Sequence, residues 1–380
     1  MAEERSEGAG SAPAADAAGS ASMAAATAAG APAARGRVAL GMSGGVDSSV
    51  AVAALQAEGY EVAGVTLVLQ DTPEARAAAE TAAGVCARLG AEHHVIAREE
   101  LFERAVAAPF AAAYAAGLTP SPCVGCNAAV KLPALLAVAD ELGCAAVATG
   151  HYARVGHLTD GRWAVLAALD HAKDQSYMLA ALTQGQLARL VLPLGGMTKL
   201  AVRAAAADLG LACADAPESQ DICFAPQGYR AFLAERGVTA EPGPILLPDG
   251  REVGRHQGLA CYTVGQRKGI GVAGPEPYYV LAKRVADNAL VVGPAAAATL
   301  ARVETGPVNW QAVDGLNAPA DAMVKLRYRS RPAACIIVPR EDGGATVRLR
   351  EPQPLTAPGQ WAVFYQGSTV LGGAVIEEVG

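Results

Sequence analysis

The chain has 380 residues, enough for two or three domains, and carries a formal net charge of -7 with an isoelectric point near 5.5. This acidic balance excludes a surface that binds nucleic acid over its whole area, so any RNA affinity has to come from local clusters. Hydrophobic residues make up 52% of the chain, but alanine inflates this share, and we expect no uninterrupted apolar run long enough to span a membrane. Eight cysteines are too few for a secreted disulfide scaffold, so particular thiols deserve scrutiny.

Residues 1–34 consist mainly of Ala, Gly, Ser and Pro, and they lack the compact Leu/Val/Ile core of a signal peptide. Mitochondrial transit peptides are rich in arginine and poor in acids, whereas this segment has four acidic residues, Glu3, Glu4, Glu7 and Asp16, before Arg35. We predict a disordered tail over 1–34 and a cytoplasmic protein with no membrane partner.

Residues 41–49 follow a strand-like segment at 37–40 and open a helix-like one at 50–55. Their two adjacent glycines allow a tight turn that brings backbone N–H groups to an anion, while Ser48 and Ser49 place hydroxyls beside it. This pattern predicts a phosphate-binding loop. The lysine of a Walker P-loop is missing, and the sequence instead resembles the PP-loop of ATP pyrophosphatases.

Strand-like and helix-like segments alternate after this loop, which is typical of a parallel α/β sheet. The expected strands are 61–69, 94–96 and 145–149, and the expected helices are 50–58, 74–89 and 129–142. Ligands of such sheets bind at the C-terminal ends of the strands. Residues 41–49 and the turn at 149–152 both lie at that edge.

Cys123 and Cys126 lie in a segment that prolines and Gly125 stiffen, just before the expected helix at 129–142. The dipole at the N-terminus of a helix lowers the pKa of a thiol, so Cys126 is a candidate nucleophile. A Cys-x-x-Cys pair also fits half a zinc site, a redox dithiol or part of an iron–sulfur site. No second close pair completes a zinc ribbon, because Cys213 and Cys223 are ten residues apart.

Cys223 lies in a loop bounded by Pro217 and Pro226, beside acidic and amide residues, which predicts an accessible thiol. The other cysteines lie in apolar or alternating segments, and we expect them to be small core residues. They are Cys86, Cys144, Cys213, Cys261 and Cys335.

The character of the chain changes at about residue 226, where Pro and Gly become frequent and short alternating runs appear at 278–281 and 289–292. These features predict a small β-rich domain over 226–300, after a catalytic domain over 35–225. Beyond it, five runs separated by turn residues predict a C-terminal β-barrel over 301–380. These runs are 323–328, 334–338, 345–350, 361–365 and 370–376.

Basic residues gather at a few places that could contact RNA phosphates or stack on bases. Arg327, Arg329 and Arg331 are expected to alternate along one strand face, and Lys173 neighbours Gln175. A solvated surface with no ligand is the alternative interpretation of each cluster.

Taken together, the chain from about residue 37 to its C-terminus resembles the bacterial tRNA-specific 2-thiouridylases. The resemblance rests on GMSGGVDSS (41–49), PSPCVGCN (120–127) with Lys131, ATGHYAR (148–154), KDQSYML (173–179), LPLGGMTK (192–199), SQDICF (219–224), YTVGQRKGIG (262–271) and RYRSRP (327–332). It implies an N-terminal PP-loop domain of the adenine nucleotide alpha hydrolase-like type, a small central β domain and a C-terminal β-barrel.

The resemblance also implies a reaction, the ATP-dependent 2-thiolation of the wobble uridine in tRNA. In that family the uridine O2 is adenylated, pyrophosphate leaves, and sulfur then attacks C2 and expels AMP. The cysteine matching Cys223 carries a persulfide. The one matching Cys126 is the nucleophile, which either assists release of the sulfur or attacks the activated base, and the two cysteines end as a disulfide. The implied cofactors are ATP and Mg²⁺. The implied partners are tRNA and a persulfide sulfur donor, either a cysteine desulfurase or a sulfur-relay protein.

The family's binding positions carry over to two sets of residues. The expected ATP-binding residues are Gly41, Met42, Ser43, Gly44, Gly45, Val46, Asp47, Ser48, Leu67 and Gly150. The residues expected at the target base or the rest of the tRNA are Ser121, Pro122, Cys123, His151, Lys173, Asp174, Gln175, Arg327, Tyr328 and Gln360.

Two positions depart from the family pattern. Many relatives have Asp where this chain has Cys123, and a thiol cannot take over acid/base work without a shifted pKa. Cys123, Cys126 and Cys223 could instead hold a [4Fe-4S] cluster, as three cysteines do in some PP-loop tRNA thiolases. Residues 67–70, Leu-Val-Leu-Gln, also differ from the relatives' Met-Lys/Asn-Trp segment at the adenine pocket.

Two other classes of protein remain as alternatives. A small-molecule PP-loop ligase, similar to argininosuccinate or NAD synthetases, would explain the loop but not Cys126 or Cys223. An RNA-binding module without catalysis would explain the basic cluster and leave the thiols without a role.

Overall fold

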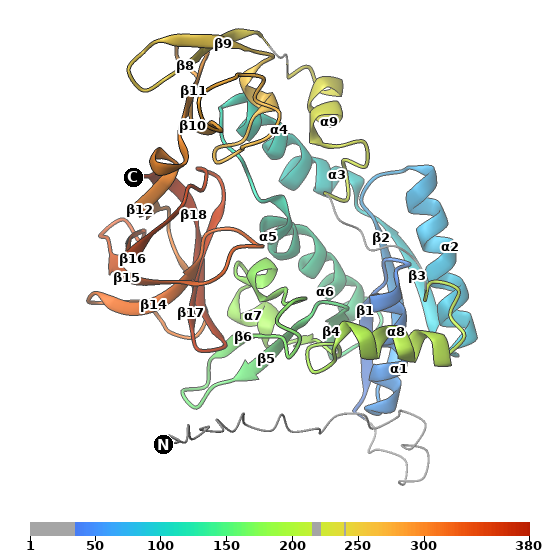
Figure 1. The fold of residues 1–380 in the computed structure, drawn as a ribbon. Coiled ribbons are helices and arrows are strands. Elements are labelled where there is room, and N and C mark those ends of the chain that lie inside the picture. Colours follow the sequence, from blue (N-terminus) through green and yellow to red (C-terminus); the bar gives the residue numbers. More distant parts are fainter. Residues whose placement is uncertain (1–34, 215–221, 239–240) are drawn as a thin grey trace, which may run out of the picture.

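Three β-sheets and the helices around them make up the fold, seen here in a computed structural model that describes residues 35–214, 222–238 and 241–380 (Figure 1). The tail predicted over 1–34 lies outside these residues, as do residues 219–221 of the motif SQDICF. The three sheets follow one another along the chain, with one exception that is described below.

The N-terminal sheet is parallel, as predicted. Its strands are, in spatial order, β3 (Glu92–Ala97), β2 (Glu61–Val68), β1 (Arg37–Gly41), β4 (Ala146–Thr149) and β7 (Leu190–Val191). Val38, Ala39 and Leu40 of β1 are all fully buried, because helices cover both faces of the sheet. The carboxyl ends of β1 and β4 meet where Gly41 pairs with Thr149, so the two predicted ligand-binding turns lie side by side.

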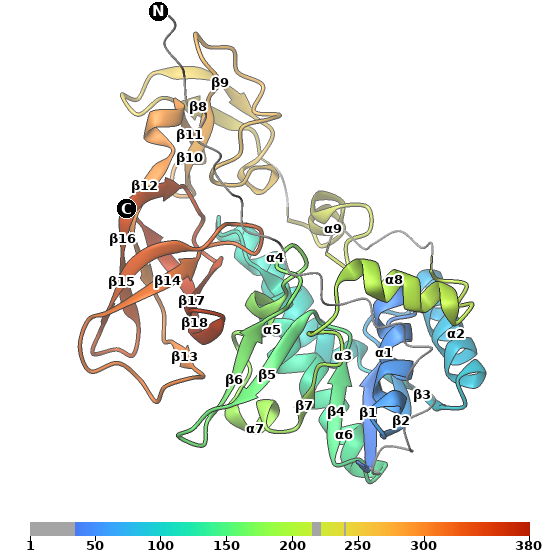
Figure 2. The same cartoon turned by 60° about the horizontal axis from the view of Figure 1, so that its bottom comes forward.

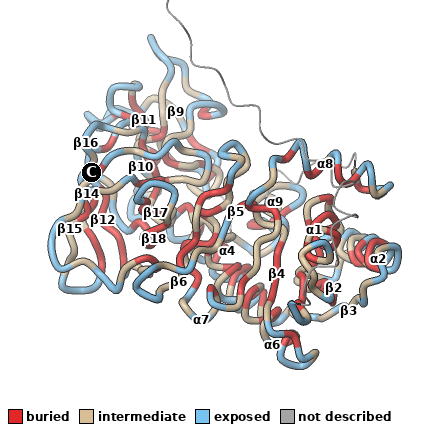
Figure 3. Tube along the Cα trace, turned by 90° about the horizontal axis from the view of Figure 1, so that it is seen from below, coloured by how far each residue is buried: buried red, intermediate tan, exposed pale blue. Residues whose placement is uncertain are grey.

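Helices cover this sheet on both faces (Figure 2). The helices α1, α2 and α8 pack on one face, and α6 packs on the other. Buried residues concentrate along the strands, while α2 alternates buried and exposed positions (Figure 3). The helices up to residue 208 are α1 (Val46–Ala57), α2 (Pro73–Arg88), α3 (Glu99–Phe102), η2 (Glu103–Ala107), α4 (Ala108–Ala115), α5 (Pro122–Cys126), η3 (Asn127–Lys131), α6 (Leu132–Glu141), η4 (Ser176–Leu179), α7 (Gln184–Leu187) and α8 (Lys199–Asp208).

The middle of the chain forms a four-stranded sheet in the order β10-β11-β8-β9, preceded by helix α9 (Tyr229–Glu235). Its strands are β8 (Gly243–Leu246), β9 (Glu252–His256), β10 (Tyr279–Arg284) and β11 (Ala289–Gly293), with short 3-10 turns at η5 (Leu259–Cys261) and η6 (Ala295–Ala297). Ile245, Val280 and Leu290 belong to the same buried cluster as Val347 and Phe364 of the C-terminal part. The two parts therefore share one hydrophobic core.

The C-terminal part is an antiparallel barrel, as predicted. Six strands follow the order β12-β16-β15-β14-β17-β18, and pairing of β12 with β18 closes the barrel. Their bounds are β12 (Thr299–Thr305), β14 (Ala320–Lys325), β15 (Ala333–Pro339), β16 (Ala345–Pro354), β17 (Trp361–Gln366) and β18 (Thr369–Val379), and the short β13 (Asn309–Trp310) pairs with β18.

One hairpin crosses between the parts of the chain. Strands β5 (Ala153–His157) and β6 (Trp163–Ala167) follow the parallel sheet in sequence but extend the C-terminal sheet, where β6 pairs with β18. The backbone N–H of Ala167 donates to the carbonyl of Ser368 at 2.7 Å. No local sequence pattern announces a pairing between strands so far apart in the chain.

The prediction that Arg327, Arg329 and Arg331 alternate along a strand face is wrong. Strand β14 ends at Lys325, and the arginines lie in the turn before β15. Ser330 closes this turn, since its hydroxyl donates to the Arg327 carbonyl at 2.9 Å and accepts from the Arg327 N–H at 3.2 Å. Serine commonly stabilises turns in this way, and Pro332 cannot donate a strand hydrogen bond.

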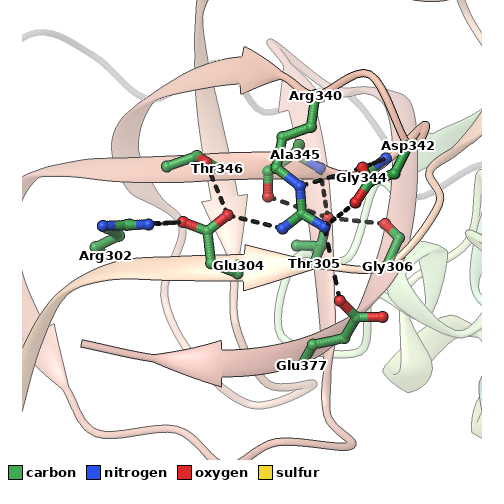
Figure 4. Close-up of polar contacts among 10 residues, drawn as sticks. All are labelled: Arg302, Glu304, Thr305, Gly306, Arg340, Asp342, Gly344, Ala345, Thr346 and Glu377. Carbon is green, nitrogen blue, oxygen red and sulfur yellow. Dashed lines mark hydrogen bonds and ion pairs between the residues drawn. The ribbon is translucent and has the colours of Figure 1, made fainter.

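A polar network lies across the closing strands of the barrel (Figure 4). The buried carboxylate of Glu304 accepts hydrogen bonds from Arg302 at 2.5 Å, Arg340 at 2.9 Å and Thr346 at 2.7 Å. Arg340 also pairs with Asp342, and its guanidinium lies 3.8 Å from Glu377 on β18. Burial alone would raise the pKa of Glu304, but the hydrogen bonds from Thr346, Arg340 and Arg302 outweigh it and lower the pKa.

We expect Glu304→Gln to lower the free energy of unfolding by about 1–3 kcal/mol at pH 7, because the variant leaves Arg340 and Arg302 without their shared anion. A carboxyl whose pKa is lower in the folded state stabilises the protein above its unfolded pKa, about 4.3, and loses this effect as the pH falls through the folded value. Melting temperatures of wild type and variant should therefore begin to approach each other below about pH 4 and converge once the pH has fallen through the lowered pKa of Glu304. Glu341→Gln, at an exposed position, is the matched control.

Residues Pro122–Glu141, which combine α5, η3 and α6, are long and apolar enough by composition to cross a membrane. Asn127 and Lys131 interrupt this stretch, so it is not the uninterrupted apolar run that the sequence excludes. Half of this stretch is buried inside the fold, as in a core helix of a soluble protein, and it contains Cys126 and Lys131.

Candidate functional site

The phosphate-binding loop turns tightly between β1 and α1. Gly44 has a φ of +74°, and a Cβ placed there would lie 2.6 Å from the carbonyl oxygen of Ala78, so only glycine fits. The Ser48 hydroxyl lies 3.2 Å from both the backbone nitrogen and the hydroxyl of Ser43, and it donates to the Gly45 carbonyl at 3.1 Å. These bonds hold the loop in one shape at the N-terminus of α1, where the helix dipole favours an anion.

Gly150 brings a second turn against this loop. A Cβ at Gly150 would lie 3.1 Å from the Ser48 backbone nitrogen, so the end of β4 touches the start of α1. Met42 and Val46 point into the core, whereas Ser43 is exposed. Leu67 lies further along the sheet, half-buried on β2 and paired with Ile96 of β3.

Two residues that sequence reasoning left without a role complete the loop. The Asp47 carboxylate accepts from the Tyr152 hydroxyl and from the Lys199 ammonium, each at 2.7 Å through the same oxygen. Lys199 is buried in the first turn of α8 and brings a cation to a loop that lacks the Walker lysine. Tyr152 lies in the motif ATGHYAR and Lys199 lies in the motif LPLGGMTK. Their places in these two motifs were the signal by which the sequence could have indicated a role for them.

The Cys-x-x-Cys pair is helical, so the predicted loop before the helix is wrong. Helix α5 begins at Pro122, which is favourable at the first helical position because it lacks an N–H. Cys126 is only 4% exposed, and burial raises the pKa of its thiol to about 11 despite the opposing effect of Lys131. The expected lowering of this pKa by the helix dipole is thus also wrong, since Cys126 ends the turn and faces the core.

Cys123 and Cys223 lie near Cys126 and share Lys131 as a neighbour. Burial raises the pKa of Cys123, Lys131 opposes this, and Cys223 adds to it. Burial alone would lower the pKa of Lys131, but the negative charge that Cys126, Cys223 and Cys123 can carry outweighs burial and raises it. Cys223 is exposed, as its loop position predicted.

An aromatic cluster anchors the segment that carries Cys223. The next residue, Phe224, packs edge-on against Phe102, Phe110 and Phe232, with ring centroids 4.9 to 5.3 Å apart. Cys126 belongs to the same buried cluster. Phe224, the neighbour of the exposed Cys223, therefore packs into the same core that surrounds the buried Cys126.

The remaining cysteines mostly match their prediction as core residues. Cys86, Cys144, Cys213 and Cys335 are buried, and Cys261 is partly exposed at the edge of the middle sheet.

His151 connects the phosphate loop to the thiols. Its Nδ1 lies 2.8 Å from the Thr149 hydroxyl, and its Nε2 lies 3.5 Å from the side-chain nitrogen of Asn127, the residue after Cys126. Burial, with a contribution from Lys131, lowers the pKa of His151 to about 3, so its imidazole is neutral at physiological pH. The Asn127 amide donates to the Met178 carbonyl at 3.0 Å, which fixes its orientation.

Two of the expected tRNA-facing residues are held within the fold. The Asp174 carboxylate accepts from the N–H groups of Ala168 and Ser176, and its side chain is only 10% exposed against Lys325 of the barrel. Gln175 accepts from the Tyr152 backbone N–H at 2.9 Å. Lys173, the third residue of this run, is half-exposed.

The segment before α5 docks on the barrel. The N–H of Thr119 donates to the Pro358 carbonyl, that of Ser121 donates to the Gly359 carbonyl, and the Gln360 amide donates to the Thr119 carbonyl at 2.7 Å. Three of the predicted residues, Ser121, Pro122 and Gln360, are thus brought together.

The barrel turn lies near the same segment. Arg327 and Tyr328 are half-buried at its base, where the rings of Tyr328 and Tyr177 lie 6.1 Å apart. The Tyr177 hydroxyl donates to the Trp361 carbonyl of the barrel at 3.0 Å. Arg329 and Arg331 are exposed at the tip.

Among the residues that the structure describes, no group of three or more His, Cys, Asp or Glu side chains is arranged to hold a metal ion.

A parallel sheet that carries this anion-binding loop without a Walker lysine defines a PP-loop ATP-binding protein. Residues 36–227, 230–294 and 302–376 match the family models for the tRNA methyl transferase HUP domain, the tRNA methyl transferase PRC-barrel domain and the aminomethyltransferase beta-barrel domain. The chain is 48% identical to the tRNA-specific 2-thiouridylase MnmA of Chloroflexus aurantiacus, over 89% of this chain and 98% of that one. It belongs to the tRNA-specific 2-thiouridylase family.

Further comparisons agree with this membership. The MnmA protein of Heliobacterium modesticaldum is 45% identical over 89% of this chain and 92% of its own length. The resemblance stated from the motifs is thereby confirmed, and with it the expected enzyme class, a tRNA-uridine 2-sulfurtransferase. The solved structure of the U34-tRNA thiolase NcsA from Methanococcus maripaludis with its [4Fe-4S] cluster is 17% identical, with a TM-score of 0.34 over 54% of this chain and 64% of that one. This likeness is too distant to bear on the thiols.

Proposed function

We propose that this enzyme transfers sulfur to C2 of the wobble uridine in tRNA, with ATP activating the uridine O2. The observation that carries the proposal is the continuous path from the phosphate loop to the thiols. Gly150 touches Ser48, His151 follows Gly150 and contacts Asn127, and Asn127 follows Cys126. A uridine held along this path would lie between ATP at the phosphate loop, which supplies the leaving group, and the thiols, which supply the sulfur.

ATP supplies the leaving groups. The phosphate loop, the N-terminus of α1 and Lys199 would hold the β,γ-pyrophosphate while the uridine O2 attacks the α-phosphorus. Pyrophosphate then departs and leaves AMP on O2. Mg²⁺ is expected to accompany the nucleotide, because divalent cations commonly neutralise phosphate charge.

Sulfur then moves in two steps. The terminal sulfur of a Cys223 persulfide attacks C2 and expels AMP, so that Cys223 is joined to the base through two sulfur atoms. The Cys126 thiolate attacks the Cys223 sulfur, the sulfur–sulfur bond breaks, and its electron pair stays on the sulfur bound to C2. The products are 2-thiouridine and a disulfide between Cys126 and Cys223, which an external thiol reduces before a persulfide donor reloads Cys223.

The exposure of Cys223 and the burial of Cys126 suit these two tasks. A persulfide donor has to reach the carrier thiol, whereas the resolving thiol needs to meet only the adduct within the site. Cys123, half-buried near both, is assigned no acid/base role. The alternative is the cluster mechanism, in which Cys123, Cys126 and Cys223 hold a [4Fe-4S] cluster.

The parts of the chain divide this work. Residues 35–225 would bind ATP and perform the chemistry, while 226–300 and 301–380 would hold tRNA in the cytoplasm. Ser121, Pro122, Cys123 and Gln360 would border the target base, with His151, Lys173, Arg327 and Tyr328 nearer the RNA backbone.

The test is to supply unmodified tRNA, ATP, Mg²⁺ and a persulfide donor, and to digest the tRNA for mass spectrometry of its nucleosides. We expect 2-thiouridine, with one AMP and one pyrophosphate released per sulfur transferred. Pyrophosphate release that depends on a free amino acid or another small acid, and not on tRNA, would favour a small-molecule ligase. RNA binding without release of either product would favour a binding module.

Charge reversal at the exposed tip of the barrel turn, Arg329→Glu with Arg331→Glu, should weaken tRNA binding at least tenfold at low salt, since each phosphate contact releases counterions. The slope of log affinity against log salt should fall by about 1–2 for the double variant. Binding of ATP, measured by calorimetry, should not change. Equal losses of ATP and tRNA affinity would show that the turn has a structural role instead.

A further inference from the structure

The helix that carries Cys126 is interrupted by one π-helical turn, Asn127–Lys131, between α5 and α6. The N–H of Leu132 donates to the carbonyl of Asn127, five residues back. In a regular α-helix, residues five apart point about 140° away from each other. A turn closed by bonds to the fifth residue reduces this angle and moves Lys131 toward the face of Cys126, and such turns occur frequently at functional sites.

The surroundings of Lys131 are unusual for a lysine. It is half-buried, and within the described residues it forms no ion pair with a carboxylate. The titratable groups that face it in this part of the chain are the thiols of Cys126, Cys223 and Cys123 and the imidazole of His151. His151 is neutral, so the thiols are the groups here that can supply a negative charge to the ammonium.

We propose that Lys131 is a positioning residue for sulfur transfer, whose ammonium serves as the counter-ion of the anionic sulfur that passes between Cys223 and Cys126. This inference rests on the proposed function for its purpose, since a sulfurtransferase has to keep a nucleophilic sulfur charged inside a largely buried site. Burial at Cys126 disfavours the thiolate, and the positive charge of Lys131 opposes that cost. The π-turn explains how a lysine five residues away reaches this place.

The experiment measures the ionisation of Cys126 directly. Wild type and Lys131→Met are alkylated with iodoacetamide from pH 6 to 11, and mass spectrometry follows the peptide that contains Cys126. We expect the midpoint, extrapolated from the rising limb of the rate profile because burial raises the pKa of Cys126 to about 11, to rise by about one pH unit in Lys131→Met, which makes alkylation at pH 8 about tenfold slower. Lys131→Arg should keep most of the wild-type profile because it keeps the charge.

Two controls keep the result interpretable. Lys199→Met removes the cation at the phosphate loop and should leave the Cys126 midpoint unchanged. Lys131→Gln replaces Lys131→Met should the latter fail to fold by circular dichroism. An unchanged midpoint in a folded, neutral Lys131 variant, or equal midpoints for Arg and Met at this position, would overturn the proposal.

Alkylation needs neither ATP nor tRNA, so this test is independent of the proposed function. A wild-type enzyme that forms no 2-thiouridine while the midpoint still shifts would overturn the proposed function and leave the pairing of Lys131 with Cys126 supported. Formation of 2-thiouridine by the wild-type enzyme, together with an unchanged midpoint in Lys131→Met, would support the proposed function and overturn the pairing of Lys131 with Cys126.

Discussion

Cys223→Ser is expected to release pyrophosphate in the presence of tRNA, leaving AMP on the uridine O2, but to form no detectable 2-thiouridine. A hydroxyl cannot accept sulfur by thiol exchange, so no persulfide is loaded, while the phosphate loop is unaffected. Cys126→Ser should differ in one respect, since it accepts labelled sulfur at Cys223 but releases it as 2-thiouridine at least a hundredfold more slowly. The measurement is radiolabelled sulfur on protein and on tRNA after rapid quenching.

Cys123 is the deciding control for this series. In the relay, Cys123→Ser and Cys123→Asp cost little, and Asp restores the carboxylate common among relatives. Cys213 is a buried thiol with no part in the proposed chemistry, so Cys213→Ser checks for general effects of a Cys-to-Ser change on folding. Should Cys123→Ser be as inactive as Cys126→Ser, and free of iron where anaerobically purified wild type holds iron, the relay is wrong and the cluster mechanism is right.

Asp47→Ala is expected to reduce tRNA-dependent pyrophosphate release by about a hundredfold to a thousandfold, the range seen when one preorganised charge-stabilising group is removed. The Asp47 carboxylate holds both the Lys199 ammonium and the Tyr152 hydroxyl at 2.7 Å, so its loss lets the cation leave the loop. Lys199→Met should cause a similar loss, and the double variant should be no worse than the single ones, because the two residues act as a unit.

The control for this pair is Tyr152→Phe, which removes one hydrogen bond and keeps both charges. It should retain most of the activity, and thermal melting should confirm that all variants fold. Pyrophosphate release at the wild-type rate in Asp47→Ala would remove Asp47 from the phosphate site and would weaken the assignment of the whole loop.

The sequence was most informative where a function depends on local backbone geometry. The phosphate loop needs glycine at residue 44 and hydroxyls at the start of α1, and both requirements are visible in nine consecutive residues. The parallel sheet and the barrel were equally accessible, because a strand buried on both faces and a strand exposed on one face leave different hydrophobic patterns.

What could not be predicted depends on contacts between distant segments. Lys199 meets Asp47 across about 150 residues of chain, and no local pattern encodes that distance. The prediction that the pKa of Cys126 is lowered was wrong because the helix starts earlier than expected. The thiol therefore lies at the end of α5 and belongs to the buried aromatic cluster that contains Phe224. The arginine turn was misjudged because alternation alone cannot distinguish a strand from a turn closed by Ser330.

The hairpin β5–β6 imposes an order on the folding of the chain during synthesis. Its partner, strand β18, lies about 200 residues later and is the last strand to leave the ribosome. At about 5–20 residues per second, the edge of β6 stays unpaired for roughly 10–40 seconds after it is made. An unpaired edge is a place where chains associate wrongly, so this interval is a window for chaperone binding or aggregation of the nascent protein. A ribosome-bound chain truncated before residue 369 should therefore be more sensitive to protease at residues 153–167 than the full chain.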